Sequence, residues 1–149
     1  MKRSERLDVV QQVTSRNERE HAERVAAAQR HLQEMEDKHS ALEKYRGEYE
    51  AGFAARSRAG FGAAGVRDFQ AFLARLGEAL NAQAQLVEQA RVALEAVRSQ
   101  WREAAQRAHV VDSLAERWQS EETRAENRRE QNDTDELSSQ RAATREQTK

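Results

Sequence analysis

The chain has 149 residues and a formal net charge of −1, because 25 Lys and Arg residues offset 26 Asp and Glu residues, and it contains neither Cys nor Pro. This balance argues against a nucleic-acid partner held by counterion release, and the lack of Cys excludes disulfides and thiolate metal ligands. With 34% charged residues and few aromatic ones, the composition is typical of a long helix or coiled coil rather than of a β-rich domain.

No run of apolar residues approaches the roughly 18 that a membrane-spanning helix needs. The start of the chain is charged, which is unlike a secretory signal segment. We therefore expect a cytoplasmic protein with no direct membrane insertion.

Residues 6–51 are predicted to form the first helix. They contain no Pro and no Gly other than Gly47, so little in them opposes a helix. From Val25 onward, apolar side chains recur at alternating steps of three and four residues, which places them on one face. Between Gln11 and Arg24 the same face is polar, and we expect that stretch to pack loosely. The main apolar positions of the face are Val25, Ala28, Leu32, Met35, Leu42, Tyr49 and Phe53.

Residues 52–65 are predicted to form the turn that reverses the chain. Four of the six glycines fall in this segment, and glycine tolerates the positive φ with which helices commonly end. The two helices then run antiparallel. A turn centred near residue 58 places residue i roughly opposite residue 117 − i, so Tyr49 is expected to face Phe69, and Met35 to face Gln83.

Residues 66–120, or a longer segment, are predicted to form the second helix, which carries an unbroken apolar seam. A repeat that averages about 3.5 residues stays on one face only if the helix supercoils around a partner. We therefore expect an all-α fold, a long antiparallel two-helix coiled coil over residues 1–120. Residues 121–149 lack the seam and are predicted to be a charged, frayed and partly disordered tail. The seam positions are Val66, Phe69, Leu73, Leu76, Leu80, Gln83, Val87, Ala90, Leu94, Val97, Trp101, Ala104, Ala108, Val111, Ala115 and Trp118.

Two tryptophans of the predicted second helix lie where the first helix has few apolar side chains to pack against them. Trp101 falls opposite the polar stretch of that helix, and Trp118 lies beyond the point where the helix runs out of residues. We expect Trp101 to be thinly covered and Trp118 to have no partner in the same chain. Both indoles are candidates for contact with another protein, since Trp is enriched at binding hot spots. For Trp118 the alternative is packing against its own tail.

Phe72 is a further candidate contact residue, close to the predicted turn. It follows Phe69 by three residues and precedes Leu76 by four, and both of those residues belong to the seam. Phe72 is therefore expected to project from the flank of the second helix, where it can anchor a partner. The alternative is that Phe72 folds over the turn and packs on Phe61 or Phe53.

The remaining motifs do not support catalysis, a cofactor or a metal. The glycine-rich segment 60–65 has no strand before it and no Lys-Ser or Lys-Thr after it, so we interpret it as a turn, not as a phosphate loop. His31, Met35 and His39 share one helical face, but no carboxylate or Cys completes a metal site there. Acids alternate with Arg at helical spacings, which predicts an ion-paired surface. The chain is therefore predicted not to be an enzyme.

Four segments resemble the FliJ family of flagellar export proteins, along nearly the full length of the chain and with the turn in the same place. The third and fourth carry the most weight because they lie partly off the seam, where heptad patterns alone do not produce a match. The four segments are Leu42–Tyr49, Phe69–Leu73 followed by Leu76, Ser99–Glu103, and Ala125–Gln131 leading to Asp135–Leu137.

The resemblance implies a stalk similar to that of the rotary ATP synthases, which serves the flagellar type III export apparatus at the inner face of the cell membrane and is not itself an enzyme. The partners it implies are the export ATPase hexamer, into whose ring the rod inserts, the export gate membrane protein FlhA, and the export chaperones that it escorts. By resemblance, Phe72 and Leu76 match the gate-docking positions. Trp101, Trp118 and Arg128 would belong to the ATPase-facing end.

Two other interpretations stay open on the sequence. One is a structural coiled coil that self-associates, with the uncovered face of its tryptophans as the dimer seam. The other is the equivalent stalk protein of a virulence type III secretion system.

Overall fold

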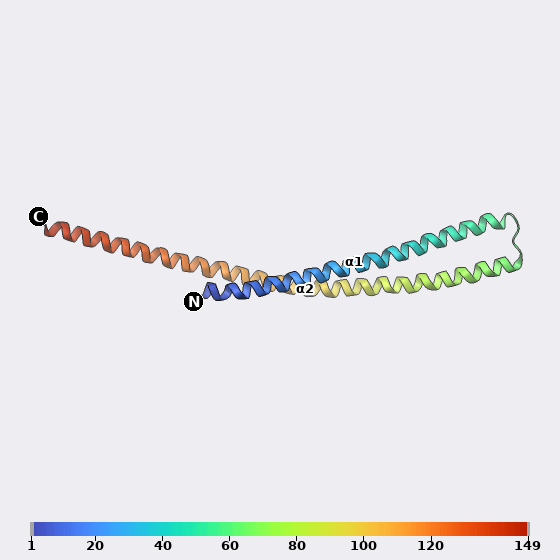
Figure 1. Ribbon diagram of the computed structural model, residues 1–149, viewed down its shortest axis with the longest axis horizontal. Coiled ribbons are helices and arrows are strands. Elements are labelled where there is room, and N and C mark those ends of the chain that lie inside the picture. Colours follow the sequence, from blue (N-terminus) through green and yellow to red (C-terminus); the bar gives the residue numbers. More distant parts are fainter. Residues whose placement is uncertain (1, 149) are drawn as a thin grey trace. The chain divides into compact units, whose positions relative to one another are not determined.

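The structure, a computed structural model, describes residues 2–148 and consists of two α-helices joined by a loop (Figure 1). Helix α1 spans Arg3–Ser57 and helix α2 spans Ala63–Gln147. The described residues contain no β-strand. The predicted all-α, two-helix fold class is therefore confirmed, although α1 is longer than the predicted 6–51 and α2 continues well past residue 120.

The chain divides into two compact units, and each contains a part of both helices. The hairpin unit consists of Arg19–Glu103 and includes the loop. The terminal unit consists of Met1–Glu18 together with Ala104–Lys149. The balance between apolar and polar contacts that hold α1 against α2 differs between the two units.

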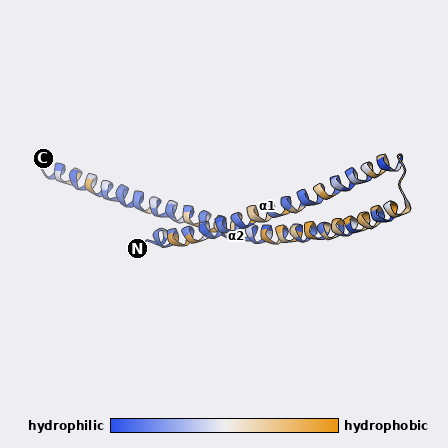
Figure 2. Cartoon of the chain, turned by 45° about the vertical axis from the view of Figure 1, so that its right-hand side comes forward, coloured by the Kyte–Doolittle hydropathy of each residue, from blue (hydrophilic) through white to orange (hydrophobic). Residues whose placement is uncertain are grey.

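An apolar seam joins the helices of the hairpin unit. Its buried residues fall on the faces that the three- and four-residue spacing predicts, and Figure 2 shows hydrophobic positions recurring along this part of α2. Burying one such aliphatic side chain stabilises the fold by roughly 1.5–3 kcal/mol. The buried residues of this unit are Met35 of α1 and Leu76, Leu80, Ala90 and Leu94 of α2.

Two contacts fix the register of the helices in the hairpin unit. Tyr49 stacks on Phe69 with ring centroids 5.3 Å apart. The side-chain amide of Gln83 donates a hydrogen bond of 2.9 Å to the backbone carbonyl of Met35. Both pairs were predicted to lie opposite each other and are confirmed. The hydrogen bond also explains how a Gln occupies a seam position, because its amide finds an acceptor inside the interface.

The loop is shorter than the glycine pattern predicts. It covers residues 58–62, whereas the predicted turn covered 52–65. Gly52 and Gly65 lie inside the helices instead. A helical glycine costs only about 1 kcal/mol relative to Ala, so a well-packed pair of long helices tolerates both.

Gly60 lies in the loop, three residues after the end of α1 at Ser57. Its φ of 94° is in the left-handed region, which a residue with a Cβ adopts only at a cost. The amide of Ala59 donates to the carbonyl of Arg56 at 3.0 Å, and the amide of Gly60 donates to the carbonyl of Ser57 at 3.2 Å. These bonds satisfy carbonyls that the end of a helix would otherwise leave unpaired.

The terminal unit combines a small apolar core with polar contacts between the helices. Leu7 of α1 and Ala104 and Ala108 of α2 are its buried hydrophobic residues. Gln11 donates a hydrogen bond of 2.8 Å from its side-chain amide to the carboxylate of Asp112. The polar stretch that was predicted to pack loosely thus begins with a direct side-chain contact to α2.

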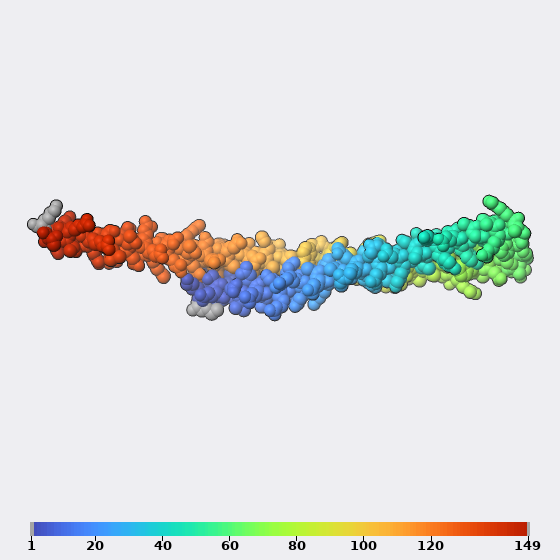
Figure 3. Space-filling model, turned by 45° about the horizontal axis from the view of Figure 1, so that its top comes forward, coloured from blue at the N-terminus to red at the C-terminus, as the bar shows by residue number. Residues whose placement is uncertain are grey.

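The C-terminal part of α2 is an exposed helix. Residues 127–147 are exposed along their whole length, and Figure 3 shows this segment (red) extending past the first residues of α1 (blue). The sequence predicted a frayed, partly disordered tail from residue 121, whereas the structure has helix as far as Gln147. The chain contains no Pro, and no Gly follows Gly77, so no residue with a strong tendency to break a helix interrupts this segment.

Candidate partner-binding surfaces

Six aromatic rings gather next to the loop, and we call them the tip cluster. Phe53 stacks on Phe69 with centroids 3.7 Å apart, and Phe61 of the loop lies 5.2 Å from Phe53. Aromatic pairs of this kind contribute about 0.5–1.5 kcal/mol beyond the area they bury. The cluster consists of Tyr45, Tyr49 and Phe53 of α1, Phe61 of the loop, and Phe69 and Phe72 of α2.

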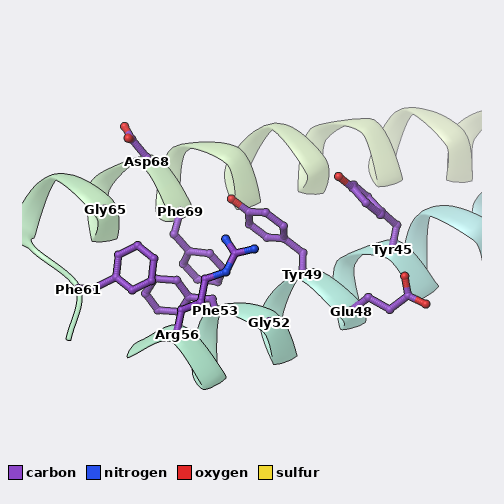
Figure 4. Close-up of a pocket in the computed structure, with 10 residues that line it drawn as sticks. All are labelled: Tyr45, Glu48, Tyr49, Gly52, Phe53, Arg56, Phe61, Gly65, Asp68 and Phe69. Atoms are coloured by element: carbon purple, nitrogen blue, oxygen red, sulfur yellow. The ribbon is translucent and has the colours of Figure 1, made fainter. Parts of the chain in front are cut away.

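A groove of about 400 Å³ lies beside the tip cluster, and Figure 4 shows the residues that line it. Rings of the cluster form its apolar part, while Glu48, Arg56 and Asp68 supply charge. Asp68 points away from the rings in Figure 4. Gly65 makes room for the ring of Phe61, because a Cβ at that position would collide with it. This mixture of rings and charges suits contact with another protein.

Phe72 is part of the tip cluster and does not project freely from α2. Its ring lies 4.3 Å from Tyr49 and 6.1 Å from Tyr45, and its side chain is half-buried. The predicted free projection is therefore wrong, and the rings that contact Phe72 are the two tyrosines rather than Phe53 or Phe61. Tyr45 lies one helical turn before Tyr49, so it widens the aromatic face of α1 toward the flank where Phe72 lies.

Leu76 lies in the seam of the hairpin unit and is only 6% exposed. Tyr45, which contacts Phe72, is 49% exposed. A partner that docks on the outside of the tip cluster therefore meets Tyr45 and the edge of Phe72 before it reaches Leu76.

Trp101 lies in the hairpin unit, where its side chain is half-buried. It borders a second groove together with Ala22 and Val25 of α1. Ala22 is too small to cover the indole, so one side of Trp101 faces this groove.

Trp118 has a partner in its own chain. The guanidinium of Arg3 lies over the indole, 4.5 Å from the ring centroid, and also forms an ion pair of 3.2 Å with Glu121. The prediction that Trp118 lacks an intramolecular partner is therefore wrong. The contact forms because α1 begins at Arg3 rather than at residue 6, so the first helix reaches further along α2 than the sequence predicted.

Two further contacts tie the start of the chain to α2, and we call them the terminal clamp. Lys2 Nζ lies 2.6 Å from a carboxylate oxygen of Glu126. Ser4 donates to Glu122 from its hydroxyl at 2.5 Å and from its amide at 3.3 Å. Sequence reasoning missed this clamp, although the two acids stand four residues apart on one helical face, which was a usable signal.

The terminal clamp shifts two pKa values. The hydrogen bond from Ser4 lowers the pKa of Glu122 below its usual value, because it favours the charged carboxylate. The hydrogen bond to Glu126, together with the charge of that residue, raises the pKa of Lys2. Both groups are open to water, so salt screens the attraction.

Arg128 is exposed on the C-terminal part of α2. The described residues include no ion pair or hydrogen bond of Arg128. The five predicted site residues are thus distributed over two units: Phe72, Leu76 and Trp101 in the hairpin unit, and Trp118 and Arg128 in the terminal unit.

Residues 2–148 contain no cluster of three or more His, Cys, Asp or Glu side chains with the geometry of a metal site. His39 lies 3.6 Å from Glu43, and Met35 between the two candidate histidines is buried in the seam. Within the same residues, neither helix combines the length and apolar character needed to cross a membrane.

Comparison with known proteins gives one match. A family model described as flagellar FliJ protein matches residues 2–147, which include both helices, the loop and every candidate residue discussed above. No curated protein and no solved structure matches the chain. Because the family match covers nearly the whole chain, the chain belongs to the FliJ family of flagellar proteins.

Proposed function

We propose that this component of the flagellar export apparatus is an adaptor with two working surfaces. The tip cluster docks on the export gate protein FlhA, and the terminal unit, with Trp101 at the adjoining part of α2, faces the hexamer of the export ATPase. The protein also escorts export chaperones on the cytoplasmic side of the membrane. Membership of the FliJ family supports this assignment.

The concentration of aromatic residues is the observation that carries the proposal. The chain has four Phe, two Tyr and two Trp residues, and every Phe and Tyr belongs to the tip cluster. A two-helix interface does not need six rings, because aliphatic residues join the helices elsewhere in the hairpin unit. Partly exposed rings held rigidly by one another are the kind of anchor that protein interfaces use.

Within this proposal the two gate-docking positions have different roles. Phe72 and its neighbour Tyr45 supply the surface that FlhA contacts. Leu76 is buried, so it acts as a positioning residue that holds α2, and with it Phe72, against α1.

Gate binding is tested by titrating the purified cytoplasmic domain of FlhA with the full chain and its variants. We expect Tyr45→Ala and Phe72→Ala to weaken binding about tenfold or more, as for hot-spot rings. Val92→Ala is the control, because Val92 is an exposed residue of α2, the helix that carries Phe72, and lies outside the cluster. Equal affinity of Tyr45→Ala and the control would contradict the assignment, once circular dichroism has shown that both variants are folded.

The ATPase contact is tested by adding the full chain to the purified hexamer of the export ATPase. We expect the rate of ATP hydrolysis to rise and then to saturate. Tyr45→Ala, which alters only the tip cluster, should stimulate as well as the natural chain. No change in rate at saturating concentration would contradict this part of the proposal.

One observation favours a second candidate function, a structural coiled coil that self-associates. Val9, Val10 and Val13 of α1 and Val110 of α2 are 46–59% exposed in the terminal unit, and a second copy is one way to cover them. Sedimentation separates the two candidates: a monomer at tens of micromolar supports the adaptor, and a concentration-dependent dimer supports self-association.

A further inference from the structure

The groove beside Trp101 lies on the surface assigned to the ATPase, but the proposed function does not say which kind of segment occupies it. It has a volume of about 390 Å³, toward the small end of the range of protein pockets. Its lining combines an indole and small apolar side chains with two guanidinium groups and one amide. The lining residues are Ala22, Val25 and Gln29 of α1 and Arg98, Trp101 and Arg102 of α2.

The groove exists because the two helices offer side chains of unequal size at the same level. Trp101 is the only Trp of the hairpin unit, and Ala22 and Val25 of α1 lie beside it. At the end of the unit next to the loop, both helices contribute large side chains, such as Tyr49 and Phe69. The space beside Trp101 is therefore set by the sequence, and a larger residue at position 22 would fill it.

The charges around the groove are positive on balance. Arg102 forms an ion pair of 2.6 Å with Glu95, which neutralises one of the two guanidinium groups. Arg98 has no carboxylate partner among the described residues, and no acid lines the groove. An occupant that brings a carboxylate meets Arg98 with favourable charge, whereas a basic occupant meets repulsion.

From this chemistry we infer that the groove binds one segment of a partner protein, an acidic amphipathic helix that inserts a single large apolar side chain against Trp101 and places a carboxylate on Arg98. Trp and Arg are the residue types most enriched at binding hot spots. A groove of this size admits one such side chain, and the open rim leaves room for the rest of the helix. The inference deepens the proposed function, because Trp101 belongs to the surface assigned to the ATPase.

The test uses the full chain with Trp118→Phe, which leaves Trp101 as the single source of indole fluorescence. Two synthetic helical peptides serve as probes. Both carry Leu and Phe at alternating three- and four-residue steps, and they differ in having Glu or Lys on the flanks of that face. We expect the Glu peptide to change the emission of Trp101 saturably and to bind at least tenfold more tightly than the Lys peptide.

Three variants test whether the Glu peptide binds in the groove beside Trp101. Ala22→Met fills the groove with a good helix former and should abolish the fluorescence response to the Glu peptide. Arg98→Glu should weaken binding at least tenfold. Arg75→Glu, the matched control, makes the same charge change at an exposed position outside the groove and should leave the affinity unchanged.

Equal affinity for the two peptides, or undiminished binding to the Ala22→Met variant, would overturn the inference. So would a dimer in sedimentation that Ala22→Met dissociates, because the occupant would then be a second copy of the chain. The peptide assay needs no ATPase. A failed stimulation experiment with intact, Arg98-dependent peptide binding would therefore remove the proposed ATPase contact and leave the groove assignment in place.

Discussion

The hairpin unit and the terminal unit use the same pair of helices but hold them together by different means. In the hairpin unit, aliphatic residues and stacked rings lie between α1 and α2, with one ion pair of 3.9 Å between Arg91 and Glu36 beside them. In the terminal unit, three buried residues are supplemented by the Gln11–Asp112 bond, the Arg3–Trp118 contact and the terminal clamp. Apolar burial has no charge that salt can screen or that can titrate, whereas exposed charge contacts are screened and titrate. We therefore expect the terminal unit to respond to salt and pH more strongly than the hairpin unit.

The largest expected effect comes from breaking the seam of the hairpin unit. Leu80 is 6% exposed, so Leu80→Ala should lower the free energy of unfolding by about 2–5 kcal/mol. Urea denaturation followed by circular dichroism measures this change. Leu137→Ala on the exposed part of α2 is the control and should change it by less than about 0.5 kcal/mol. Equal effects of the two changes would refute the seam as the source of stability.

A smaller effect is expected from the tip cluster. Phe72→Ala removes ring contacts with Tyr45 and Tyr49 and should cost about 1–2 kcal/mol of unfolding free energy. A double-mutant cycle with Tyr49→Ala should give a coupling energy of about 0.5–1.5 kcal/mol. Strict additivity of the two changes would show that the rings do not stabilise each other.

The terminal clamp predicts a pH response confined to the terminal unit. The pKa of Glu122 is lower in the folded protein, so its contribution is present above the unfolded value of 4.5 and is lost as the pH falls through the folded value. The pKa of Lys2 is raised, so its contribution is present below 10.5 and is lost as the pH rises through the folded value.

Amide exchange measured by NMR in residues 3–18 reports this response. We expect these amides to lose protection, as the pH falls below 4.5, before those of the hairpin unit do, after correction for the intrinsic exchange rate. In the Glu122→Gln variant, we expect a smaller acid-induced loss of amide protection. An unchanged loss of protection in that variant would mean that another group titrates.

The smallest expected effect concerns Arg3. Arg3→Ala removes the guanidinium over Trp118, and cation–π contacts at exposed sites contribute about 0.5–1 kcal/mol. The emission of Trp118, measured with Trp101→Phe in the background, should shift as the indole loses its cover. Arg3→Lys should restore part of the effect. An identical emission spectrum with Arg or Ala at position 3 would show that Arg3 does not cover the indole of Trp118.

The fold was predictable because spacing determines which residues are buried. The seam through Leu76, Leu80, Ala90 and Leu94 follows from steps of three and four residues, and all four are buried. The loop was predicted at the right place in the chain, but the predicted segment was too long. Glycine content indicates where a helix can end rather than where it does end. Among residues 2–148, only Gly60 has a positive φ, and sequence alone does not single it out from its neighbours.

The candidate sites were less predictable because they depend on the register to within a few residues. Arg3 contacts Trp118 because α1 begins three residues earlier than predicted, and no residue pattern indicates so small a difference. Phe72 was predicted to project from the flank of α2, but it packs against Tyr45 of α1 across the interface. Helical periodicity describes one helix at a time and does not predict such a pair.

Hydrogen exchange read out by mass spectrometry at low salt and at 1 M salt tests the difference between the two units most directly. The account predicts that 1 M salt, where charges are screened beyond about 3 Å, reduces protection in residues 2–18 while protection around Leu80 and Leu94 is unchanged. An equal response of both units to salt would contradict it, because charge contacts would then not distinguish the terminal unit from the hairpin unit.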